Sequence, residues 1–142
     1  MKKRLFAFAL VVTFLVWGLN VLAADVVPSV ISDLSVDGLP FKTGATNQKL
    51  TFRFLSDQKP TDVLVNFYGT LPGRGVMQTF YSSKKNELEL IVEEKGDKYE
   101  VAVTRGYGSP PFVTTVDVYV WIVGTDGKTK SNKLLQKLET VK

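Results

Sequence analysis

The side chains that most often perform catalysis are missing from this sequence, which contains neither histidine nor cysteine. Their absence excludes Ser-His-Asp and Cys-His nucleophilic systems, and it excludes zinc sites built on imidazole or thiolate ligands. Carboxylates remain, and a pair drawn from Glu87, Glu89 and Glu93 would suit glycoside hydrolysis. Alternation along a strand places these three on one polar face, so a solvated strand surface is the better interpretation. We therefore expect a protein that is not an enzyme.

The sequence also gives little support for a metal site or a phosphate-binding site. Asp126 beside Gly127, or Asp33 with Asp37, offers oxygen ligands, but fewer than calcium requires. The glycine-containing segment 69–75 lacks the lysine and the following helix of a phosphate-binding loop. We expect no metal and no cofactor.

Aromatic side chains offer the other kind of chemistry, which is binding. Alternation within 115–123 directs Tyr119 and Trp121 to the face opposite Val116, Val118 and Val120. Alternation within 63–68 directs Tyr68 outward. If these two strands are neighbours in one sheet, the three rings form one exposed patch. Such a patch suits stacking on a sugar ring or burial against a protein surface, including a second copy of this chain.

Two alternatives to the aromatic patch remain open. The inward and outward assignments are reversed if the register is read the other way, because a shift of one residue exchanges the two faces of a strand. The patch is also lost if residues 37–46, or a C-terminal helix, cover it.

Tyr107 is a separate candidate for ligand binding. Glycines flank it within the segment 105–112, and the prolines that follow stiffen the loop, as in many recognition loops. The segment 71–75 is a further candidate loop. If every chain reversal is a simple hairpin, these two loops lie at opposite ends of the molecule and do not form a single site.

After its first residues, the chain consists of short β-rich runs separated by turn residues. The strands predicted from these runs must position the candidate binding residues. The predicted strands cover residues 30–36, 49–55, 63–68, 76–81, 88–93, 99–105 and 115–123. Asp126 and Gly127 match a tight hairpin turn, where both residues tolerate positive φ. Residues 130–142 form either the strand that completes this hairpin, which we favour, or an amphipathic helix with Ser131 as its cap.

The stretch from Thr115 to Asn132 resembles the final hairpin of bacterial immunoglobulin-like and fibronectin-type-III-like modules. In those modules an alternating strand runs into an Asp-Gly turn, here Asp126-Gly127, and then a Ser-Asn pair, here Ser131-Asn132. The resemblance implies an all-β, immunoglobulin-like antiparallel β-sandwich of about seven to eight strands. It implies a fold without naming a ligand. The chain departs from antibody domains in lacking their cysteines and their tryptophan on the third strand.

The first 23 residues have the three zones of a secretory signal peptide. Basic residues 2–4 precede an apolar run over 5–19, and Val21-Leu22-Ala23 supplies the small residues of a cleavage site. An uncleaved membrane anchor is the alternative, although Gly18 and Asn20 interrupt the run. Cleavage leaves a single domain over 24–142.

Cleavage also removes most of the basic excess. The whole chain has 18 Lys and Arg against 14 Asp and Glu, and losing residues 2–4 leaves 15 against 14. The net charge of the precursor therefore does not indicate nucleic-acid binding, which requires a clustered basic patch.

These observations together predict a bacterial protein exported to the periplasm or the cell exterior, which contacts the membrane only during export. It is expected to be a non-catalytic binding or adhesion module that recognises a glycan or a protein of the envelope or exterior through its aromatic face. The alternative is a structural envelope protein that acts in assembly, held by an uncleaved anchor or an edge strand.

Overall fold

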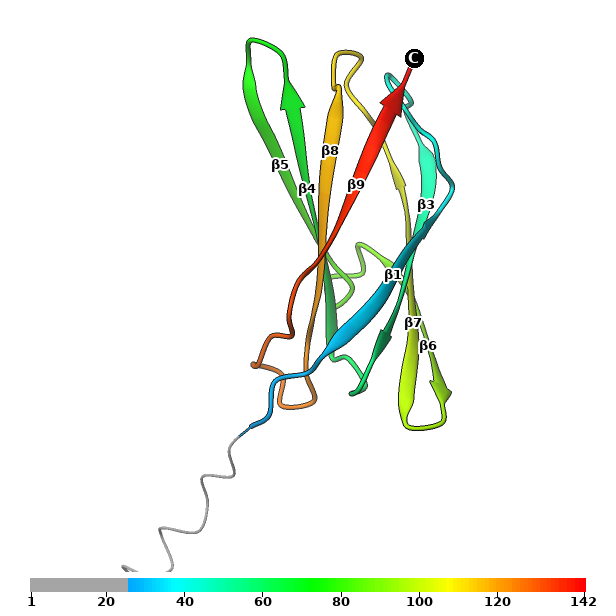
Figure 1. Cartoon of the computed structure of the whole chain (residues 1–142), viewed down its shortest axis with the longest axis vertical. Coiled ribbons are helices and arrows are strands. Elements are labelled where there is room, and N and C mark those ends of the chain that lie inside the picture. The colour runs from blue at the N-terminus through cyan, green and yellow to red at the C-terminus, as the bar shows by residue number, and fades with distance from the viewer. Residues whose placement is uncertain (1–25) are drawn as a thin grey trace, which may run out of the picture.

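The computed structural model describes residues 26–142 of the 142-residue chain, so the predicted signal peptide at 1–23 lies outside the described residues. The described chain is all β, with nine strands in two sheets that pack face to face (Figure 1). The prediction of an all-β sandwich is confirmed. Each of the eight predicted strands is present, and the ninth is the two-residue strand β2, Phe41–Lys42.

Two sheets of unequal width make up the sandwich. The four-stranded sheet has the order β1-β3-β7-β6 and consists of Ile31–Asp37 (β1), Gln48–Ser56 (β3), Lys98–Tyr107 (β7) and Glu89–Lys95 (β6). The five-stranded sheet has the order β2-β9-β8-β4-β5 and adds Leu134–Val141 (β9), Thr115–Val123 (β8), Asp62–Leu71 (β4) and Gly75–Ser82 (β5) to β2. The segment left open between strand and helix is thus the strand β9, which pairs with β8.

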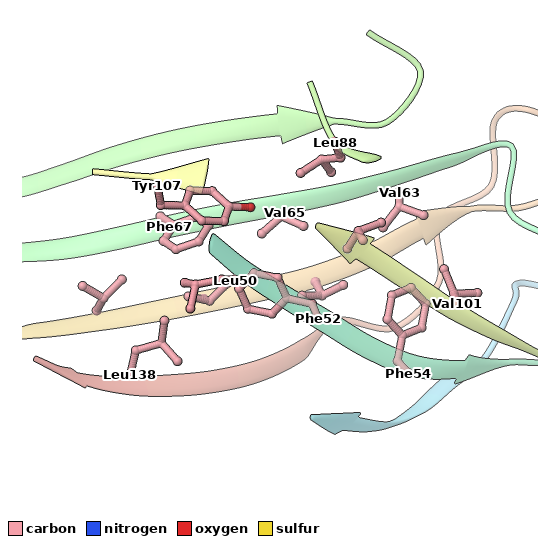
Figure 2. Packing of buried hydrophobic residues seen from close by; sticks show 14 of the residues in the cluster. Leu50, Phe52, Phe54, Val63, Val65, Phe67, Leu88, Val101, Tyr107 and Leu138 are labelled. Carbon is pink, nitrogen blue, oxygen red and sulfur yellow. The ribbon is translucent and has the colours of Figure 1, made fainter. Parts of the chain in front are cut away.

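The core lies between the sheets and is built from alternate residues of the strands. In β3 the inward side chains Leu50, Phe52 and Phe54 are fully buried, as period-2 alternation predicts (Figure 2). The inward assignment of β8 is also confirmed, because every second residue of that strand belongs to the core cluster: Val116, Val118, Val120 and Ile122.

The predicted hairpin turn joins β8 to β9, and only one of its two residues has positive φ. Gly127 has a φ of 69°, but Asp126 does not adopt positive φ. The backbone N–H of Gly127 donates to the carbonyl of Gly124 at 3.0 Å, so Asp126 occupies a central turn position. Its carboxylate accepts hydrogen bonds from the backbone N–H groups of Lys128 and Thr129. Side-chain capping by aspartate, rather than a left-handed backbone, stabilises this residue in the turn.

The passage from β5 to β6 crosses between the sheets without reversing the chain. β5 runs antiparallel to β4 and β6 runs antiparallel to β7, and Figure 1 shows β5 and β6 following the same direction. The expectation that the loops 71–75 and 105–112 lie at opposite ends assumed a simple hairpin at every reversal, and that assumption fails at this passage. The two loops meet at one end of the sandwich, where the Arg74 guanidinium lies 5.2 Å from the centroid of the Phe112 ring.

Candidate functional site

The outer face of the five-stranded sheet carries the predicted aromatic residues. β4 and β8 are neighbours, with Leu64 opposite Trp121, Asn66 opposite Tyr119 and Tyr68 opposite Asp117. These side chains lie on the face away from the core because the intervening residues fill it. The prediction that the two strands place Tyr68, Tyr119 and Trp121 on one face is confirmed.

Tyr68 and Tyr119 line a groove on this face. Their rings meet edge to face with 5.7 Å between centroids, and both side chains are half-buried. The groove has a volume of about 300 Å³. Its lining mixes aromatic, charged and small polar groups: Asn66, Tyr68, Thr70, Val76, Asp117, Tyr119 and Lys133. The two tyrosines provide ring surface, and Asp117 and Lys133 provide hydrogen-bonding groups of opposite charge.

Trp121 lies on the predicted face but is only 5% exposed, so the expectation of an open indole is wrong. Phe80 of β5 packs edge to face against its ring at 6.3 Å between centroids. Lys133 Nζ lies 4.8 Å from the centroid of the same ring. Side chains of this face therefore cover Trp121. The alternatives to an exposed patch were a cover formed by residues 37–46 or by a C-terminal helix.

Sequence reasoning missed Phe80 and Lys133 as parts of this face. The signal for Phe80 was present, since alternation in 76–81 places Val76, Gln78 and Phe80 together. Lys133 precedes β9 in an irregular stretch, where no periodicity gives its direction.

Two buried polar atoms on this face have no hydrogen-bond partner among residues 26–142. They are Oδ1 of Asn66 and Nε1 of Trp121, and each residue is only 5% exposed. Buried polar atoms are nearly always paired, because an unpaired one costs about 1–3 kcal/mol. Asn66 is also one of the residues that line the groove, although its unpaired Oδ1 is itself buried.

Tyr107 does not belong to this face, and its predicted exposure in a loop is wrong. It is the last residue of β7 and is 4% exposed, packed 4.4 Å from Phe67 between ring centroids (Figure 2). Burial raises the pKa of its hydroxyl, and the nearby Tyr81 adds to this increase while Arg105 opposes it. The hydroxyl has no hydrogen-bond partner among the described residues.

Two of the three carboxylates considered for catalysis have structural partners. Glu87 accepts a hydrogen bond from the backbone N–H of Ser82 at 2.9 Å, and Glu89 pairs with Lys49 at 3.6 Å on the surface. Within 26–142, the acidic side chains do not gather in groups of three that would hold a metal ion. The described part of the chain also contains no helix that is long and apolar enough to cross a membrane.

Comparison with known proteins supports the fold alone. No protein-family model matches the sequence, and no curated protein matches it. Among solved structures, the chain is similar to part of the chitinase ChiW from a Paenibacillus species, described as a bacterial cell-surface-expressed multi-modular enzyme machinery. The TM-score is 0.52 at 15% sequence identity, and the match covers 84% of this chain. The chain spans only 9% of that enzyme, so the likeness is to one β-rich module of a much larger protein.

Proposed function

We propose that this protein is an exported, non-catalytic binding module that recognises a glycan through the outer face of its five-stranded sheet. The observation that carries the proposal is the groove lined by Tyr68 and Tyr119 together with the charged side chains of Asp117 and Lys133. The groove contains no nucleophile of the histidine- or cysteine-dependent kind, because the chain has neither residue. Its chemistry is that of binding.

The strand order supports assignment to the immunoglobulin-like class. Immunoglobulin domains place strands A, B, E and D in one sheet and strands C, F and G in the other. β1, β3, β7 and β6 take the places of strands A, B, E and D in one sheet. β4, β8 and β9 take the places of C, F and G in the other, and β5 is added at the edge of that sheet. The sequence resemblance to bacterial immunoglobulin-like modules supports the same class.

A glycan fits the groove better than an extended apolar ligand does. Tyrosine rings offer area at low entropic cost, and sugar rings carry C–H faces that stack on them. Sugar hydroxyls also both donate and accept, so they can pair with Asn66, with the carboxylate of Asp117 and with the ammonium of Lys133. Since the similar solved structure belongs to a chitinase, chitin oligosaccharides are the first probe to test.

Export by a cleaved signal peptide completes the proposal. The three-zone pattern of residues 1–23 supports it, and a bacterial cell-surface setting of the similar chitinase agrees with it. The intact mass of protein purified from the producing cells reports the outcome, because cleavage leaves a chain that begins at Ala24. Retention of the leader would favour the alternative of an anchored structural envelope protein.

Replacing Tyr119 with alanine tests the binding face. We expect Tyr119→Ala to weaken the binding of chitin oligosaccharides by at least about tenfold in titration calorimetry, because stacking area is lost. Tyr119→Phe keeps the ring and should retain most of the affinity. Phe112→Ala is the matched control, since it removes an exposed aromatic ring from a loop outside the groove.

Two results would contradict the proposal. One is equal affinity of the wild-type protein and Tyr119→Ala. The other is the absence of binding to chitin oligosaccharides and to every other member of a panel of bacterial and plant polysaccharides.

A further inference from the structure

β5 forms one edge of the five-stranded sheet, and its outward backbone groups can be identified from the ladder with β4. The N–H of Ser83 donates to the carbonyl of Val63 at 2.9 Å. Hydrogen-bonded and non-hydrogen-bonded pairs alternate in an antiparallel ladder. Val76, Gln78 and Phe80 therefore direct their N–H and C=O groups away from β4, toward the free side of the edge.

This free side ends at Ser82. The N–H of Ser82 donates to the Glu87 carboxylate at 2.9 Å, and its carbonyl accepts from the N–H of Glu87 at 3.2 Å. Glu87 thus occupies the position that a partner strand would take next to Ser82. The unpaired stretch is Val76, Gln78 and Phe80, and among them Val76 is 65% and Phe80 54% exposed.

The other three edges of the sandwich carry features that discourage strand pairing, and β5 carries none. β6 contains four charged residues in seven, β1 is interrupted by a bulge between Ser32 and Ser35, and β2 is two residues long. Charges, bulges and short length are the usual protections of a sheet edge. The eight residues of β5, GVMQTFYS, include no charge and no proline. Long, uncharged and apolar edges of this kind pair with another strand.

We propose that β5 pairs with β5 of a second copy of this chain, antiparallel across a two-fold axis at Gln78. In that register Val76 of each copy lies opposite Phe80 of the other, and the two Gln78 side chains meet on the axis. An aromatic ring opposite a β-branched side chain is a favourable cross-strand pair, and no like charges face one another.

The flanking charges agree with this register. It brings the turn before β5 of one copy, which carries Arg74, near the end of β5 of the other, where Glu87 closes the edge beside Ser82. A positive side chain at one end of the pairing therefore meets a negative one, and the two-fold axis repeats the contact at the other end.

The proposed dimer joins two five-stranded sheets into one continuous sheet. Both grooves then open on the same surface, because β5 borders the groove through Val76. This inference does not require the proposed ligand, since the pairing involves backbone groups and the side chains of β5 alone.

A charge exchange at Gln78 tests the pairing. Protein purified from cells expressing the full chain is followed by sedimentation equilibrium from about 1 µM to about 1 mM. The wild-type protein should dimerise within this range. Gln78→Lys and Gln78→Glu should each weaken the dimer by about tenfold or more, because like charges then face each other on the axis. An equimolar mixture of the two variants should form a heterodimer again.

Ile91→Lys is the matched control for Gln78→Lys. It adds the same charge to an exposed apolar residue on the β6 edge, and it should not change dimerisation.

Amide hydrogen exchange provides a second readout that does not depend on a substitution. The N–H groups of Val76, Gln78 and Phe80 should become protected as the wild-type concentration rises. The N–H of Ser82 should show the same protection at every concentration, because Glu87 already binds it. A wild-type protein that stays monomeric throughout the range would overturn the proposal, as would a mixture of Gln78→Lys and Gln78→Glu that fails to associate.

Discussion

At the scale of single residues, Tyr107 shows that the period-2 alternation of β7 continues beyond the predicted end of that strand at Arg105. Tyr107 was expected in a loop because glycines flank it, yet it continues the inward series of Val101 and Val103 along β7. Arg105 interrupts that series and hides the pattern. Its guanidinium lies 4.1 Å from the centroid of the Tyr81 ring and donates to the carbonyl of Glu87, so a long charged side chain occupies an inward-facing position at the margin of the core.

The buried hydroxyl of Tyr107 gives a prediction for alkaline pH. In the unfolded chain a tyrosine loses its proton near pH 10, whereas burial raises the pKa of Tyr107 in the folded protein. Above pH 10 the unfolded state therefore binds fewer protons, and the free energy of unfolding falls as the pH rises. Tyr107 contributes a decrease of about 1.4 kcal/mol per pH unit in that range.

Tyr107→Phe removes this contribution, so its stability should decline less steeply than that of the wild-type protein above pH 10. Urea unfolding of both proteins between pH 8 and pH 11.5 measures the difference. Tyr119→Phe, on the half-buried outer face, controls for the loss of a hydroxyl. Parallel stability curves for the wild-type protein and Tyr107→Phe would show that the hydroxyl is not held protonated in the core.

Among the elements, the strands were predictable and one connection was not. The eight longer strands follow directly from alternation and turn residues, because each has one face in the core. The passage from β5 to β6 could not be predicted, since the polar run 82–87 reads the same whether it makes a hairpin or a crossing between sheets. Long-range contacts decide between the two. The Asp62 carboxylate at the start of β4 accepts hydrogen bonds from the hydroxyls of Ser82 and Ser83 and from the N–H of Lys84.

Removing the Asp62 carboxylate should therefore destabilise the crossing. We expect Asp62→Ala to lower the free energy of unfolding by about 2 kcal/mol, because several part-buried donors lose a charged acceptor together. Urea unfolding at neutral pH measures this loss. Asp97→Ala, in the exposed turn between β6 and β7, should change stability by no more than about 0.5 kcal/mol. Equal losses in the two variants would contradict the role assigned to Asp62.

At the scale of the whole molecule, the sequence predicted the sandwich and the face that carries the aromatic residues. It did not predict how open that face is. Alternation gives the direction of each side chain, but the exposure of Trp121 depends on Phe80 of β5 and on Lys133 before β9. Those neighbours come together only through the lateral order of strands in the folded sheet. The result is a partly covered surface with a groove beside Tyr68 and Tyr119.

The most direct test of the binding face is a titration of isotope-labelled protein with chitin oligosaccharides, followed by NMR chemical shifts. The account predicts that the changes concentrate on the backbone of Asn66, Tyr68 and Tyr119 and on the indole N–H of Trp121. Resonances of the four-stranded sheet should stay in place. Changes confined to that other sheet, or none at millimolar oligosaccharide, would contradict a glycan-binding face formed by β4 and β8.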